Sequence, residues 1–413
     1  MTCVNDWPLT VWDTGHMAPP RSPLARLRKA AGYTQESLAA QLHVDRMTVY
    51  RWEAGRNEPQ PYLWPKLAML LGINRSELQG LFPSSPTSSA PPLETLPSQA
   101  PLVLSALRRM LAGGQADTIS PGVAVTPLVK RVHQLYQHAD YEASARLLPQ
   151  LLLQLDNQAP SRTAAVWTAS GYIAAAKLAT KLGDVQAAWV TADRAQRAAR
   201  EAEAPALIAA ARYQVACAHL RSGHLTDAQD TAAAALDELA TAVQKEDGRL
   251  ILSARGALLL LSAVMAARSN EHHSARQLLS QAHQLADDLG GEGNWLWTGF
   301  GHTNVAIHEL SVAVQLRDND QAQQLGAALD TDRLPVVLIG RRSQVHLDLS
   351  RAATDRQDDS VAVLHLLEAE RVAKQAVSRN VGAHEVIRTL LGREQRHSTP
   401  GLRALAQRAG IHV

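Results

Sequence analysis

Basic and polar side chains gather in the short run from Arg46 to Arg51. An arginine guanidinium can donate two hydrogen bonds to O6 and N7 of a guanine, and a methionine can contact the methyl group of a thymine. Such side chains can read base edges in a DNA major groove if one helix presents them together. We expect this reading face to contain Arg46, Met47, Thr48, Tyr50 and Arg51. For each of them the alternative is a solvated surface residue.

Two short helices with a tight turn between them are expected to position the reading face. The first is predicted from Gln35 to Leu42, with Thr34 as its N-cap, and the second from Arg46 to Ala54. Ala39 is small enough to let the two helices cross closely. The pattern therefore predicts a helix-turn-helix, with an apolar core of Leu38, Leu42, Val44, Val49 and Trp52.

A longer signature surrounds these two helices. It consists of Gly32, then Thr34 and Gln35, and then Trp-Glu-x-Gly-x-x-x-Pro from Trp52 to Pro59. The signature resembles the phage-repressor (XRE) family of DNA-binding domains over about residues 24–81. His43 stands at the turn position where this family often has glycine. The resemblance implies a domain of five short helices that binds double-stranded DNA.

The resemblance also assigns roles to residues outside the reading face. Family members pair an arginine at the place of Arg28 with a glutamate at the place of Glu53, which here would join the first helix to the third. Gln35 would hold a phosphate and brace the reading helix. Arg56 and Asn57, in the loop after the reading helix, would contact phosphates.

The positive charge of the chain is concentrated on this domain. The 413 residues have a net charge of only +2. Residues 21–82 contain nine Lys or Arg and five Asp or Glu, a balance of +4. Residues 1–20 contain two aspartates and no lysine or arginine, a balance of −2. A local basic excess is what binding to phosphates requires, although a small basic domain of another kind would have the same charge.

The cysteine content and the hydropathy of the chain predict a cytoplasmic, nucleoid-associated protein. Cys3 and Cys217 are the two cysteines, and they are too few for a disulfide framework. No secretion signal is visible at the N-terminus. We also expect no apolar run as long as a membrane span.

Composition divides the chain into four parts. Residues 1–20 lack periodicity and are expected to form a flexible arm, and residues 21–82 form the DNA-binding domain. The segment 83–101 is rich in proline and serine and is predicted to be a linker. Residues 102–413 alternate helical patterns with short breaks, which predicts an all-α C-terminal domain.

The breaks in the C-terminal domain recur along the sequence, and a similar pattern of small residues follows most of them. They are expected at 138–140, 183–184, 223–224, 269–270, 318–320 and 357–359. Two small residues seven positions apart follow most breaks and would face a close neighbouring helix. These pairs are Ala188 and Ala195, Ala228 and Ala235, Ala275 and Ala282, and Ala362 and Ala369, with Ala322 and Leu329 in the remaining repeat. The pattern looks like degenerate tetratricopeptide repeats, which stack into a superhelix with a concave inner surface; an alanine-rich helical bundle is the alternative.

One segment of this domain interrupts the alanine-rich pattern with aromatic and polar side chains. Aromatic walls beside amide, imidazole and guanidinium groups could bind a ligand on the concave surface. The candidate residues are Trp295, Trp297, Phe300, Asn304, His308, Arg341, Arg342 and His346. The alternative is that the tryptophans and His308 are ordinary core residues.

The whole order of domains is similar to a family of actinobacterial XRE regulators with tetratricopeptide-like C-terminal domains. This second resemblance implies a transcription factor whose helical domain dimerises or senses a peptide, a small molecule or a protein partner. A two-fold symmetric operator and a homodimer would follow. An interaction scaffold, in which DNA contact is secondary, is the other interpretation. No spacing typical of a zinc site, a phosphate loop or a catalytic nucleophile was identified, so we expect no enzyme, cofactor or metal.

Overall fold

The computed structural model describes residues 23–42, 44, 46–54, 59, 64–73, 104–113, 124–242, 248–394 and 399–411. Helices account for most of these residues, and no strand occurs among them. The fold is all-α, as predicted. The chain divides into two compact units, and the described residues up to 73 belong to the N-terminal unit and those from 104 onward to the C-terminal unit.

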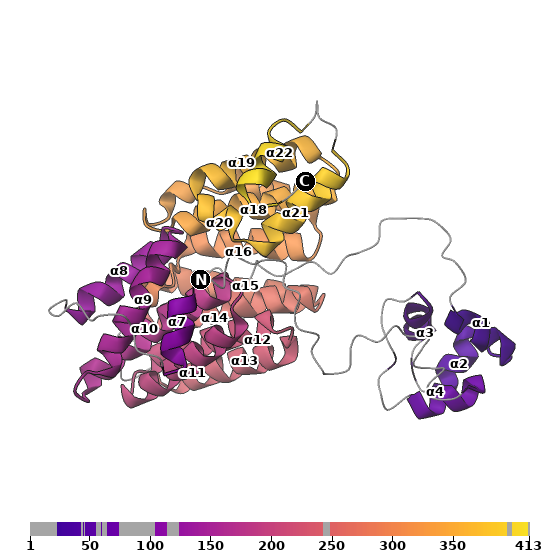
Figure 1. The fold of residues 1–413 in the computed structure, drawn as a ribbon, viewed down its shortest axis with the longest axis horizontal. Coiled ribbons are helices and arrows are strands. Elements are labelled where there is room, and N and C mark those ends of the chain that lie inside the picture. Colours follow the sequence, from indigo (N-terminus) through magenta and orange to yellow (C-terminus); the bar gives the residue numbers. More distant parts are fainter. Residues whose placement is uncertain are drawn as a thin grey trace. The chain divides into compact units, whose positions relative to one another are not determined.

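The described part of the N-terminal unit contains four short helices (Figure 1). They are α1 (Pro23–Ala30), α2 (Gln35–Leu42), α3 (Arg46–Glu53) and α4 (Trp64–Leu71). Their apolar faces share one small core, which includes Leu24, Leu38, Leu42, Val49, Trp52 and Leu67. The end of the DNA-binding domain at 74–82, where the fifth helix implied by the resemblance would lie, is outside the described residues, as are the arm at 1–20 and the linker at 83–101.

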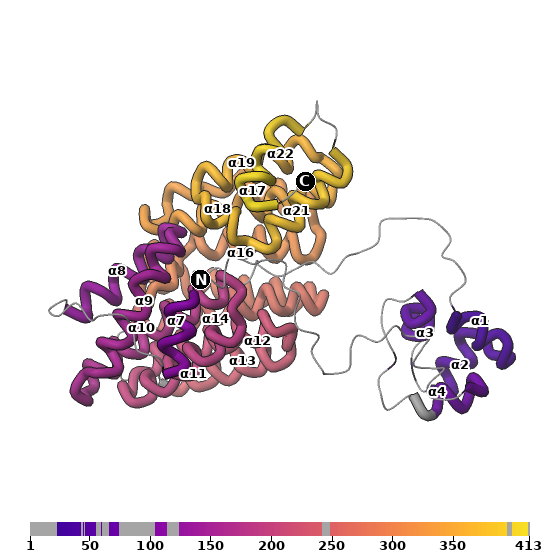
Figure 2. The backbone as a smooth tube through the Cα atoms, in the orientation of Figure 1, coloured from indigo at the N-terminus to yellow at the C-terminus, as the bar shows by residue number. Residues whose placement is uncertain are grey.

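The C-terminal unit is a row of antiparallel helix pairs (Figures 1 and 2). After α7 (Ser105–Leu111), the pairs are α8 (Val125–Gln137) with α9 (Tyr141–Asp156), α10 (Arg162–Lys181) with α11 (Val185–Glu201), α12 (Pro205–Arg221) with α13 (Leu225–Ala242), α14 (Gly248–Arg268) with α15 (His272–Leu289), α16 (His302–Gln315) with α17 (Asn319–Ala328), and α18 (Ile339–Asp355) with α19 (Asp359–Val372). The short helices are η2 (Trp295–Trp297), η3 (Thr331–Arg333), α20 (Lys374–Ser378), α21 (Val381–Gly392) and α22 (Leu402–Arg408).

The six predicted breaks coincide with the turns inside these pairs, within a residue or two. Each turn places one residue in the left-handed region, with φ between 58° and 82°. In four of the six turns an aspartate then accepts a hydrogen bond from the backbone N–H three residues later, which caps the second helix. The left-handed residues are Ala139, Gly183, Gly223, Asn270, Arg317 and Gln357.

The paired alanines lie on the second helix of the pairs that follow α8 and α9, where that helix packs closely against its neighbours. Each of the nine alanines that form this seven-residue pattern in the five repeats is at most 1% exposed. Leu329, which replaces the second alanine in one repeat, lies just beyond the end of α17 and is half-buried. The seven-residue spacing therefore marked the close contacts between helices.

The C-terminal unit closes on itself. The Arg379 guanidinium, just after α20, forms an ion pair with Glu142 of α9 at 2.8 Å. The backbone N–H of Glu142 donates to Oε1 of Gln375 at 3.1 Å, and Ala373 and Ala376 share an apolar core with the α8–α9 turn. These contacts join the segment around α20 to the start of α9.

Helix α14 corrects the expectation that no apolar run is as long as a membrane span. An 18-residue window within its 21 residues has a mean hydropathy of 2.0, but 78% of that window is buried inside the protein. The helix packs against α12, α13, α15 and α16, so most of its surface faces other helices. It is the one helix among the described residues that meets the length and hydropathy criteria for a membrane span.

Candidate functional site

Helix α3 separates its buried side chains from the predicted reading face. Val49 is fully buried and Trp52 is 4% exposed. Met47 and Tyr50 are 48% and 39% exposed. Arg46 and Arg51 are exposed and Thr48 is half-buried, so one side of α3 carries two guanidinium groups, a thioether and a phenol.

Glu53, at the end of α3, joins three helices. Its Oε1 lies 2.5 Å from Nε of Arg28 on α1, and its Oε2 accepts from Nε2 of Gln35 on α2 at 2.6 Å. Arg28 also donates through Nη1 to the carbonyl of Tyr33 at 2.7 Å. The side chains of Arg28 and Glu53 are only 7% and 8% exposed, so this ion pair is screened little by solvent.

Gln35 therefore orients the reading helix through Glu53. One of its amide protons is directed to the carboxylate, and the side chain is half-buried. Ala39, at the crossing of α2 and α3, is 3% exposed. The start of α2 is capped as expected, because the backbone N–H of Ser37 donates to Oγ1 of Thr34 at 3.0 Å and the N–H of Thr34 donates to Oγ of Ser37 at 2.8 Å.

Sequence reasoning missed a role for Glu36. Its Oε1 lies 2.8 Å from Nε of Arg46, and both side chains are about 60% exposed. Hydrogen bonds to its own backbone N–H and to Thr34 lower the pKa of Glu36, and Arg46 contributes to the same lowering. Exposed ion pairs of this kind are weak, so Arg46 can exchange Glu36 for another acceptor. The available signal was an acidic residue in the first turn of α2, beside the start of α3.

Two predicted phosphate contacts, Arg56 and Asn57, lie outside the described residues. The four residues predicted to be structural, Arg28, Ala39, Trp52 and Glu53, all lie in the interior of the N-terminal unit or at its edge. Together they fix the orientation of α3 and leave its reading face exposed.

The predicted ligand residues of the C-terminal unit do not share one exposed surface. The Trp297 ring stacks on the ring of His133 on α8, with centroids 4.6 Å apart and planes 3° from parallel. The Trp297 carbonyl accepts from Nζ of Lys177 on α10 at 3.1 Å. Asn294 and Gln137 exchange two amide hydrogen bonds, at 2.9 and 3.0 Å. The segment before α16 is thus bound to the first two helix pairs.

Four of the predicted ligand residues are buried. Phe300 is fully buried against Gly256, where an added Cβ would meet the ring at 2.1 Å. His308 is 4% exposed and its Nδ1 lies 2.8 Å from the carbonyl of Asn304. Burial lowers the pKa of His308 to about 3, and the positive charge of Arg341 adds to the lowering. Asn304 and Arg341 are 1% and 5% exposed.

The remaining candidates have other protein partners. The ring of Trp295 lies under the guanidinium of Arg249, 5.7 Å from its centroid. Arg342 pairs with Asp332 at 3.1 Å, and Nδ1 of His346 lies 3.3 Å from Nδ1 of His365. These contacts favour the core-residue alternative over a preformed ligand surface.

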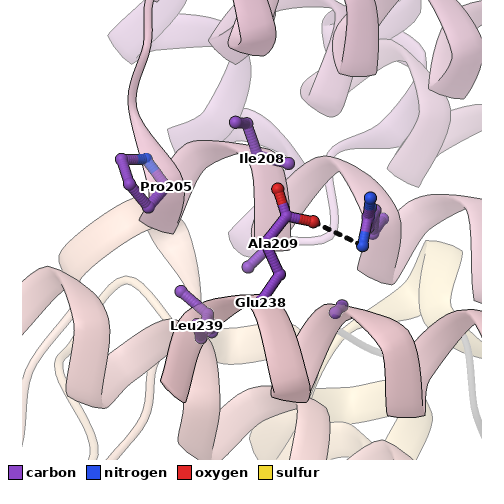
Figure 3. Close-up of a pocket in the computed structure, with 7 residues that line it drawn as sticks. Pro205, Ile208, Ala209, Glu238 and Leu239 are labelled. Carbon is purple, nitrogen blue, oxygen red and sulfur yellow. Dashed lines mark ion pairs between the residues drawn. The ribbon is translucent and has the colours of Figure 1, made fainter. Parts of the chain in front are cut away.

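Two pockets in the C-terminal unit are lined by other residues. The first lies between α12 and α13, beside an ion pair of Arg212 and Glu238 at 2.6 Å (Figure 3). The second, of about 70 Å³, lies among α17, α18 and α19 and includes Arg356 and His365. Neither is lined by any of the eight predicted ligand residues.

The comparisons with known proteins concern the N-terminal unit. Residues 24–78 match a family model described as helix-turn-helix, the model of XRE-family units. No curated protein sequence matches the chain. The match covers α1 to α4, and with them the reading face and the residues that hold it. Residues 24–78 are therefore an XRE-type helix-turn-helix, the kind of unit by which regulators bind DNA.

Proposed function

We propose that this protein is a sequence-specific, DNA-binding transcriptional regulator that reads its operator with α3. The observation that carries the proposal is the exposed face of α3, held in place by the bridge from Arg28 and Gln35 to Glu53. A helix presented in this way can enter a major groove, which is wide enough for an α-helix.

In the proposed complex, Arg46 and Arg51 contact guanines or the flanking phosphates. Each good bidentate contact contributes about 1 to 3 kcal/mol of discrimination against the wrong base. Met47 and Tyr50 provide apolar contacts to thymine methyl groups or sugars. Arg46 first leaves Glu36, which costs little because both side chains are mostly exposed.

The regulator acts as a homodimer on a two-fold symmetric operator, with dimerisation through the C-terminal unit. One helix-turn-helix contacts only a few base pairs, so a second copy is needed for useful specificity. A regulator of this kind would act in the cytoplasm, on the DNA of the nucleoid.

The C-terminal unit, which we interpret as tetratricopeptide-like, senses a peptide, a small molecule or a protein partner. The support is a set of buried polar side chains on the first helices of successive pairs, which packing alone does not require. In Gln214 both the amide nitrogen and the amide oxygen are buried without a hydrogen-bond partner, as are Oγ of Ser253 and Oδ1 of Asn304. A polar ligand reaching these groups would satisfy them and change the packing of the pairs.

The DNA-binding half of the proposal is tested with the full chain. Binding sites are first selected from random DNA, and the affinity for the selected operator is then measured as a function of salt. The double variant Arg46→Ala/Arg51→Ala should lose operator binding by about a hundredfold or more and show a shallower salt dependence. Arg333→Ala is the matched control, since this arginine is 77% exposed in the C-terminal unit.

If the double variant binds the operator as the wild type does, α3 is not the reading helix. Genomic sites bound with and without cell extract would test the sensing half. An extract that leaves both the bound sites and their affinities unchanged would argue for the scaffold interpretation, in which the C-terminal unit binds another protein and DNA contact is secondary.

A further inference from the structure

Two histidines and an aspartate converge at the turn between α12 and α13. His219 lies in the last turn of α12, His224 lies just before α13, and Asp227 lies in its first turn. One potential ligand atom from each of the three residues lies within 4.8 Å of the other two. We propose that these three side chains bind one divalent transition-metal ion of the Zn²⁺ class, with the remaining coordination position taken by water.

The side-chain distances fit such an ion after a small adjustment. Zinc bound at about 2.0 to 2.1 Å in tetrahedral geometry keeps its ligand atoms roughly 3.3 Å apart. Oδ2 of Asp227 lies 3.8 Å from Nδ1 of His219 and 4.0 Å from Nδ1 of His224. The side chains of Asp227 and His224 are 60% and 59% exposed, so both can move by the half ångström or so that coordination needs.

The backbone of the turn brings the two histidines together. Gly223 has φ of 82°, a conformation that favours glycine. The N–H groups of Ser222 and His224 both donate to the carbonyl of His219, each at 3.0 Å. The spacing His-x₄-His-x₂-Asp is not a familiar zinc-binding pattern in a sequence. The left-handed turn at Gly223 is what brings the three side chains close together.

His219, the less exposed of the two histidines, is held in place by packing against Trp189. The ring of Trp189 on α11 packs edge-on against the ring of His219, with centroids 4.4 Å apart, and Nε1 of Trp189 donates to Oγ of Ser222. Nδ1 of His219 is buried and has no hydrogen-bond partner, which leaves it available to a metal.

The donor set determines the class of ion. Two imidazoles and one carboxylate suit Zn²⁺ and its neighbours in the first transition series, whereas Mg²⁺ and Ca²⁺ prefer sites made of oxygen ligands. Because the protein provides three ligands, of which His224 and Asp227 are largely exposed, the ion is expected to bind reversibly and to clamp the last turn of α12 to the first turn of α13. The inference does not depend on DNA binding.

The chain offers matched controls. His224→Ala and Asp227→Asn each remove one exposed ligand and leave the core intact. His272 and His273 are an exposed pair at the start of α15, after the corresponding turn of the next helix pair, and among the described residues they belong to no such group of three. The double variant His272→Ala/His273→Ala therefore removes two histidines without touching the proposed site.

The test is calorimetric titration of the full-length, chelator-treated protein with ZnCl₂ in a buffer that contains excess Mg²⁺. We expect one equivalent to bind, with affinity at least about tenfold weaker in His224→Ala and in Asp227→Asn, and unchanged in the His272/His273 double variant. Circular dichroism checks that each variant is folded. The proposal is overturned if Zn²⁺ binding is absent, or if it is equally strong in His224→Ala, in Asp227→Asn and in the wild type.

Discussion

At the scale of single residues, Glu53 has the largest structural role in the N-terminal unit. It accepts from Arg28 and from Gln35, and the arginine is only 6% exposed. A buried cation that loses its partner remains desolvated without compensation, which is why breaking such a pair costs more than forming it contributes.

We predict that Glu53→Gln lowers the unfolding free energy of the N-terminal unit by about 3 kcal/mol, because the charge of Arg28 is left uncompensated. Hydrogen exchange of the amides in α1, α2 and α3 should accelerate by about a hundredfold. Glu36→Gln, which removes the partner of an exposed arginine, should change exchange little. Equal effects of the two variants would show that burial of the Arg28–Glu53 pair is unimportant.

A second prediction concerns the buried imidazole of His308. Its folded pKa of about 3 is far below the value near 6.5 expected in the unfolded chain. The unfolded state therefore takes up a proton as the pH falls below about 6.5, whereas the folded state does not until about pH 3. The contribution of neutral His308 to the stability of the folded state is therefore complete above about pH 6.5. It is lost as the pH falls from about 6.5 towards 3, at up to about 1.4 kcal/mol per pH unit.

His308→Gln should remove this part of the pH dependence, because glutamine does not titrate. Melting temperatures of the wild type and the variant, measured between pH 7.5 and pH 4.5, should therefore converge as the pH falls. His272→Gln replaces an exposed histidine and should run parallel to the wild type. Parallel curves for His308→Gln would contradict the assignment of His308 as a neutral buried group.

At the scale of elements, the turns within the helix pairs share one backbone conformation but not one residue type. Gly183 and Gly223 occupy the left-handed position without a Cβ, whereas Gln357 occupies it with φ of 63°. A non-glycine residue there is strained by about 1 to 2 kcal/mol, although glycine loses more entropy on folding.

We predict that Gln357→Gly raises the stability of the C-terminal unit by about 0.5 to 1 kcal/mol, while Gly183→Ala lowers it by about 1 kcal/mol. Thermal unfolding of the full chain, followed by circular dichroism, would measure both shifts. Opposite signs for the two variants are the expected signature. Shifts of the same sign would show that contacts around the turns outweigh the backbone conformation.

At the scale of the whole molecule, closure of the C-terminal unit connects residues more than 230 positions apart. Arg379 and Gln375 contact Glu142 at the start of α9, and Trp297 contacts His133 of α8 and Lys177 of α10. A signal that changes one helix pair can therefore affect the two ends of the row together.

We predict that Gln375→Ala/Arg379→Ala opens this closure. The N–H of Glu142 loses its side-chain acceptor, so hydrogen exchange should increase at the start of α9 and around α20. Arg371→Ala is the control, since Arg371 pairs with Glu368 three residues earlier. Unchanged exchange at the start of α9 would show that apolar packing of Ala373 and Ala376 is sufficient for closure.

The sequence alone determined the elements whose signals are local. Apolar spacing and capping residues predicted α2 and α3, and the turn residues and paired alanines predicted the helix pairs. Local backbone energetics and the helical period act over a few residues. They can therefore be recognised in the sequence without knowing which distant segments come into contact. The same locality explains why Val49 and Trp52 could be assigned to the core.

The tertiary structure decided what depends on contacts between distant residues. The chain order does not show that Trp297 stacks on His133, that α20 closes against α9, or that His219, His224 and Asp227 converge. It also decided that Phe300, Asn304 and His308 are buried, because an aromatic and polar run looks the same in a core as in a binding surface. Burial is a property of the whole packing, and a sequence pattern specifies only which faces prefer it.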